Sequence, residues 1–145
     1  MKRVWDAGLK PVFIVGDGIG LPLGQQFDVV YNWEVNVLSV LYPGYQLWGV
    51  NYEHEYWNLG TFTQWIADVN YVSATYPGRW NFSAYVARTP SSLQAQQIVS
   101  ATIDILEVTN YNSGAPDPNG VTGFINAINT AAVTAGVIQD FVPLW

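Results

Sequence analysis

The chain lacks cysteine and has few charged residues, and these two shortages exclude several classes of protein. Without cysteine it can form no disulfide framework, no thiolate metal site and no cysteine nucleophile. Charged residues make up 11% of its 145 positions, against about 25% in a typical soluble domain. The five Lys and Arg residues are scattered and the net charge is −6. We therefore expect no nucleic-acid partner, because phosphate contacts need a basic surface.

Histidine is also scarce, since it occurs only at position 54. His54 stands between Glu53 and Glu55, but a strand would point it away from both carboxylates. The sequence therefore predicts no metal site, no cofactor and no catalytic residue, and we expect a protein that is not an enzyme. A small carboxylate-dependent hydrolase is the third-ranked alternative. It would need Glu53 or Glu55 to meet another carboxylate, such as Asp104 or Glu107.

Long hydrophobic runs are missing too. The longest uncharged stretch, between Glu34 and Glu53, contains Asn, Ser, Pro, Gly and Gln, which makes it a poor membrane span. The apolar run Pro11–Val15 is too short for the hydrophobic region of a secretory signal. We expect synthesis in the cytoplasm and a single domain over residues 1–145.

A glycine-rich string, Gly16–Gly20, follows the run Val12–Val15. A dinucleotide-binding fingerprint requires G-x-G-x-x-G at the start of a helix, and Pro22 interrupts such a helix. The string is therefore predicted to be a turn or a docking loop.

Aromatic residues are abundant, at 15% of the chain, with seven Trp and nine Tyr. One small core would hardly cover them all, and Trp and Tyr are enriched at protein interfaces. We expect the N-terminal segment 1–10 and the apolar C-terminal arm 137–145 to pack on neighbouring subunits. The interface candidates are the large apolar residues of these segments and of one aromatic strand: Phe141, Val142, Leu144, Trp145, Trp48, Tyr52, Tyr56 and Trp5.

These features predict a non-enzymatic structural subunit of a self-assembling particle, and hence a homo-oligomer. A virion component (capsid, tail or neck) is the first setting and a filament the second, so the expected location is a virion or an assembled extracellular structure. The alternative is a carbohydrate-binding or adhesion module with a glycan partner. In that module the exposed rings of Trp48, Tyr52, Tyr56 and Trp57 would stack on sugar faces.

Hydrophobic periodicity predicts the elements of structure. The segment Phe27–Leu41 fits both a helix and a strand. The likeness of Val35–Gly44 to a later helical segment, Val69–Gly78, favours a helix. The fold class predicted is α+β, a small and mostly antiparallel sheet with packed helices, with an all-β sandwich or jelly roll as the alternative. The other expected elements are helices over 62–76, 90–106 and 121–135, and strands over 12–15, 45–57 and 79–87.

Overall fold

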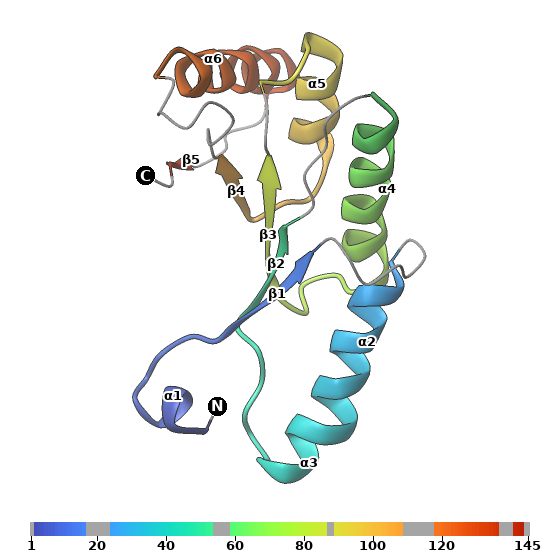
Figure 1. Cartoon of the computed structure of the whole chain (residues 1–145), viewed down its shortest axis with the longest axis vertical. Coiled ribbons are helices and arrows are strands. Elements are labelled where there is room, and N and C mark those ends of the chain that lie inside the picture. The colour runs from blue at the N-terminus through green and yellow to red at the C-terminus, as the bar shows by residue number, and fades with distance from the viewer. Residues whose placement is uncertain are drawn as a thin grey trace.

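The computed structural model describes residues 2–16, 24–53, 59–86, 89–108, 118–136 and 141–143. Strands alternate with helices along these ranges (Figure 1). No helix of the described ranges has the length and apolar character that crossing a membrane requires. The elements are α1 (Lys2–Asp6), β1 (Val12–Gly16), α2 (Gln25–Trp33), the π-helical turn η1 (Glu34–Leu38), α3 (Ser39–Leu41), β2 (Gly49–Glu53), α4 (Leu59–Thr75), β3 (Asn81–Val86), α5 (Ser92–Ser100), β4 (Ile105–Val108), α6 (Pro118–Ala135) and β5 (Phe141–Pro143).

The sheet is wholly parallel, and its strand order, β1-β2-β3-β4-β5, follows the chain. The expected antiparallel sheet is therefore wrong, as is the all-β alternative, and the fold is α/β. The error came from the segment 90–106, which was predicted as one helix. Helix α5 ends at Ser100, Ala101 has extended backbone angles, and Ile105–Val108 forms β4. With that strand present, helical crossovers return each strand in the same direction.

Two short turns explain the internal likeness between Val35–Gly44 and Val69–Gly78. Both segments end a helix in Tyr-Pro-Gly, with Gly44 at φ 89° and Gly78 at φ 66°. Glycine adopts this left-handed conformation without the steric penalty of a side chain. The two turns lead into β2 and β3, which are adjacent strands. The likeness therefore marks equivalent helix-to-strand turns of neighbouring units.

Helices α2 and α4 cover one face of the sheet (Figure 1). The Phe27 ring of α2 lies 5.3 Å from that of Tyr52 and 5.9 Å from that of Phe82, measured between centroids. Tyr52 also donates a hydrogen bond to Asp68 of α4. Right-handed crossovers that always step in one direction place successive helices on the same face. The alternate strand residues, among them Asn51, Ser83 and Tyr85, lie on the opposite face and are buried as well.

The acidic residue within the segment 27–41, Glu34, is fully buried. Its carboxylate accepts hydrogen bonds from Leu47 N at 2.8 Å, Trp80 Nε1 at 2.8 Å and Arg79 Nε at 3.3 Å. A buried charge needs such partners. Glu34 thereby ties the π-helical turn to the chain entering β2 and to the chain entering β3.

Candidate functional site

Two glutamates from different strands stand at the carboxyl end of the sheet. Glu53 is the last residue of β2, and Glu107 is the next-to-last residue of β4. Strand alternation puts both on the face opposite α2 and α4, because Tyr52 and Leu106 belong to the buried core. Tyr85 of β3 pairs with Glu107 and lies next in register beside Glu53. Two strand spacings separate the glutamates, so their Cα atoms are about 10 Å apart.

A buried polar cluster connects these strands below the glutamates. The Asn51 amide of β2 donates from Nδ2 to Ser83 Oγ at 2.9 Å and to Glu107 Oε1 at 2.5 Å. Asn51 is 6% exposed and Ser83 is 4% exposed. The side chain of Glu107 therefore leans back across β3 toward β2, the strand that carries Glu53. This contact fixes the orientation of the Glu107 carboxylate.

The other amide atom of Asn51, Oδ1, is buried and has no hydrogen-bond partner among the described residues. Its orientation is determined by chemistry, since a carboxylate only accepts hydrogen bonds and the atom that meets Glu107 must be the nitrogen. A buried acceptor without a partner costs about 1–3 kcal/mol. The described residues leave this cost uncompensated.

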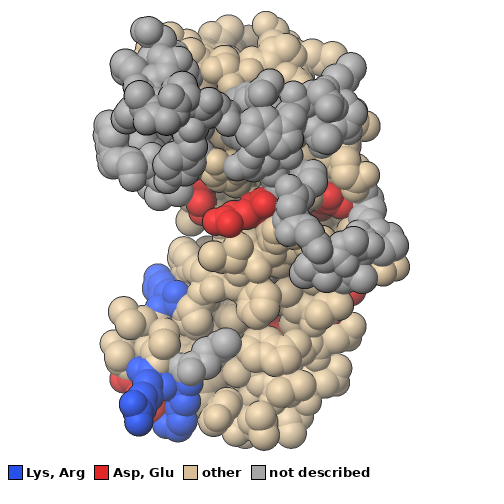
Figure 2. All heavy atoms as spheres, in the orientation of Figure 1, with Lys and Arg blue, Asp and Glu red and all other residues tan. Residues whose placement is uncertain are grey.

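On its β1 side the cluster borders the edge strand of the sheet. Gly16 pairs with Glu53 and carries no side chain, and Ile14, which pairs with Asn51, is 59% exposed. Glu53 is exposed and Glu107 is half-buried. In Figure 2, most of the visible acidic atoms lie at the middle height of the molecule, and most basic atoms lie lower. Glu53 and Glu107 make the described part of the site acidic.

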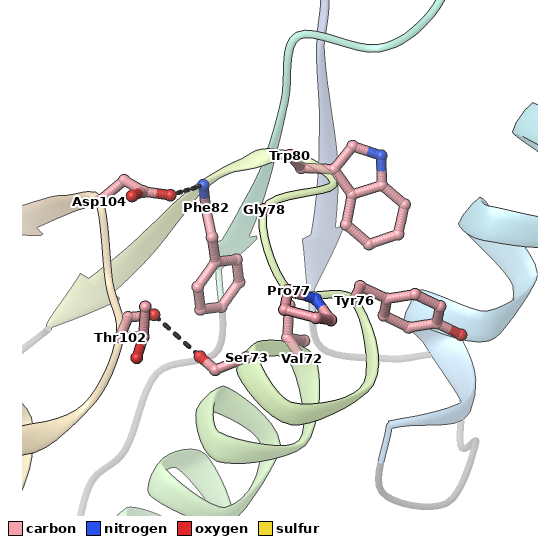
Figure 3. Close-up of a pocket in the computed structure, with 9 residues that line it drawn as sticks. All are labelled: Val72, Ser73, Tyr76, Pro77, Gly78, Trp80, Phe82, Thr102 and Asp104. Carbon is pink, nitrogen blue, oxygen red and sulfur yellow. Dashed lines mark hydrogen bonds between the residues drawn. The ribbon is translucent and has the colours of Figure 1, made fainter.

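A hollow lies at the opposite, amino-terminal end of the strands. This shallow pocket has a volume of about 190 Å³ and includes Tyr76, Trp80 and Asp104 in its lining (Figure 3). The Asp104 carboxylate accepts a hydrogen bond from the backbone of Phe82 at 2.7 Å. Asp104 therefore connects two strands at the far end of the sheet and does not meet Glu53. Of the two carboxylates predicted as partners of Glu53, Glu107 is the nearer one.

Of the aromatic residues proposed for an interface or for glycan stacking, Trp5, Trp48 and Tyr52 have described side chains, and these three do not form one exposed strip. Tyr52 is 4% exposed and belongs to the core. Trp48 is half-buried, with Lys10 Nζ 5.0 Å from its ring centroid. Trp5 is half-buried against its own chain, where its indole donates to Gln46 O at 2.9 Å.

The remaining predicted residues divide into two groups. Phe141 and Val142 belong to β5, which pairs with β4 of the same chain. Whether they also contact another subunit stays a prediction. The others lie outside the described residues: His54, Glu55, Tyr56, Trp57, Leu144 and Trp145.

Within the described ranges, no three His, Cys, Asp or Glu side chains are grouped so that they could hold a metal ion. Comparison with known proteins finds no matching family model, no similar curated protein and no similar solved structure. The function must therefore be argued from the geometry alone.

Proposed function

We propose that this chain carries the site of a hydrolase that works by general acid–base catalysis with Glu53 and Glu107. The observation that supports this most is their common position at the carboxyl ends of parallel strands, beside a buried amide with an unpartnered acceptor. In α/β sheets, ligands bind outside the carboxyl ends of the strands. A strand order that follows the chain also resembles the wall of a (β/α) barrel, whose active sites lie at that end.

The two carboxyl groups suit different roles. Asn51 holds Glu107 in one orientation. A carboxylate that attacks the sugar carbon, or that activates a water molecule, must be oriented in this way. Glu53 is exposed at the strand end, where it can deliver a proton to a leaving group. Hydrolysis of glycosidic bonds is the reaction that a pair of carboxyl groups performs by itself.

The test is hydrolysis of a panel of 4-nitrophenyl glycosides and of polysaccharides, with release of nitrophenol or reducing ends as the readout. Glu53→Gln and Glu107→Gln should each lower kcat about 100-fold or more, since a positioned acid or base contributes about 10²–10⁴-fold. Asp104→Asn is the matched control, because it neutralises a carboxylate at the far end while keeping an acceptor for Phe82 N. Hydrolysis that survives both glutamine substitutions would refute the proposal, as would a wild-type protein inactive on every substrate.

A structural subunit is the second candidate, and one observation favours it. The edge strand β1 exposes three apolar side chains, Val12 at 43%, Phe13 at 37% and Ile14 at 59%. Unpaired edges with apolar residues are sites of association. Self-association through β1 would cover them, and assembly into a particle or filament, including a virion, would follow from repeated contacts.

Light scattering after size exclusion tests this candidate. Ile14→Lys should reduce the oligomer to a smaller species, whereas Val133→Lys, at an 82% exposed apolar position of α6, should not. A wild-type monomer would overturn the second candidate and leave the first untouched.

A further inference from the structure

We infer that Asn51 is the substrate-recognition residue of this site, and that its Oδ1 accepts a hydrogen bond from a sugar hydroxyl next to the bond that is cleaved. This inference rests on the proposed hydrolase function and specifies its substrate class as a glycoside.

The argument begins with the hydrogen-bond inventory of the Asn51 amide. Both Nδ2 hydrogens are used, one by Ser83 Oγ at 2.9 Å and one by Glu107 Oε1 at 2.5 Å. The remaining polar atom, Oδ1, can only accept. It has no partner among the described residues, although Asn51 is only 6% exposed. The missing partner must therefore be a donor.

The position of the acceptor identifies the kind of donor. Asn51 and Glu53 lie on the same face of β2, with one residue between them, so their Cα atoms are about 6.5–7 Å apart. Glu107 touches Asn51 directly. A group bound at Oδ1 thus lies within one sugar ring of both carboxyl groups. A hydroxyl beside the reacting carbon fits this position, and hydrogen bonds to such a hydroxyl strengthen in the transition state of glycoside hydrolysis.

One residue then has two roles, since Nδ2 orients Glu107 and Oδ1 reads the substrate. No bond to Asn51 forms or breaks. In the overall reaction, water adds across the glycosidic bond: the leaving oxygen takes the proton of Glu53 and the sugar carbon takes hydroxide from water. Glu107 takes the one proton that this water has left, and transfer of that proton through solvent to Glu53 restores the acid.

The experiment compares a 4-nitrophenyl glycoside with its 2-deoxy analogue. Wild type should prefer the hydroxylated substrate in kcat/KM by about 100-fold or more beyond the intrinsic reactivity difference, because a site built for a hydroxyl rejects analogues that lack it. In Asn51→Ala this preference should fall to within about threefold of the intrinsic reactivity ratio of the two substrates. The variant has no acceptor at this position, so the deoxy substrate leaves no buried group without a partner. Ser83→Ala is the matched control: it removes a buried neighbour of Nδ2 but keeps Oδ1, and should keep the preference.

Asn51→Asp separates the two roles of the residue, because it keeps an acceptor and removes the donor to Glu107. It should lose kcat and retain discrimination against the deoxy substrate. Circular dichroism and thermal melts verify that each variant folds, and a variant that does not fold is replaced by Asn51→Ser.

The outcomes distinguish the two proposals. If wild type hydrolyses glycosides and Asn51→Ala keeps the full preference, the inference about Asn51 is wrong and the hydrolase proposal stands. If wild type hydrolyses no glycoside, the hydrolase proposal fails. Calorimetric titration with the same two glycosides then decides on Asn51, since equal affinity of wild type for both would also refute the recognition role.

Discussion

Replacement of Glu34 by glutamine tests how much one buried carboxylate contributes to the fold. The carboxylate serves three donors: Leu47 N on Oε1, and Trp80 Nε1 and Arg79 Nε on Oε2. Glutamine keeps the shape but offers one acceptor oxygen, and its NH₂ group would face a donor. Either Leu47 N or the Trp80 indole therefore loses its partner inside the protein.

The magnitude follows from two contributions. An orphaned buried donor costs about 1–3 kcal/mol, and each remaining bond weakens by about 1 kcal/mol when its acceptor loses its charge. The Arg79 side chain is 34% exposed, so solvent screens that ion pair and its share is small. We expect Glu34→Gln to lower the free energy of unfolding by about 3 kcal/mol, out of a total of about 5–15 kcal/mol for a natural domain.

Urea unfolding followed by tryptophan fluorescence measures this change, because Trp80 is itself in the cluster. With a slope of about 2 kcal/mol per M, the midpoint should fall by about 1.5 M. The control is Arg79→Gln, which removes only the partly exposed partner and should cost less than about 1 kcal/mol. A loss below 1 kcal/mol in Glu34→Gln would refute the reasoning, because it would mean that the three donors find other acceptors.

Two further predictions concern the helices around this cluster. Gly24 has φ 74°, and an added Cβ would lie 2.4 Å from the Tyr71 ring. Gly24→Ala should therefore lower the thermal midpoint of unfolding much more than Gly44→Ala does, because Gly44 has φ 89° but open space around it. Equal shifts in the two variants would contradict this prediction. Burial and, after it, the hydrogen bond to Asp28 raise the pKa of the Tyr76 hydroxyl in the folded protein. The neutral hydroxyl therefore stabilises the fold fully below the unfolded pKa of about 10, and this contribution is lost as the pH rises beyond that value. Tyr76→Phe should therefore flatten the fall in urea midpoint above pH 10, and parallel curves for the two proteins would argue against it.

Much of the secondary structure could be predicted from periodicity, and the topology could not. The helical stripe of Phe62, Trp65 and Val69 corresponds to α4, and the alternation in 79–87 to β3. The sheet topology was mispredicted because of one boundary, the end of α5. Ile103 and Leu106 continue the apolar spacing of α5, so the periodicity predicts a helix where β4 lies. A four-residue buried strand reads like a helix segment by periodicity alone. Without β4 the chain would end in two consecutive helices, and such an order does not favour a parallel sheet.

Part of the candidate site could be predicted from the sequence. The other residues could not, because their position depends on how the strands are paired. The sequence points to Glu53 as a candidate carboxylate and to Glu107 as a partner that a carboxylate site would need. Asn51 and Ser83 were missed because a polar residue in a strand usually faces solvent. The parallel order brings them into adjacent strands at one level, where both are buried. Once the strands are parallel and in chain order, every polar side chain on the face away from the helices points to one shared surface. An acidic pair far apart in sequence, with a buried amide between its members, then becomes the arrangement whose chemistry must be tested first.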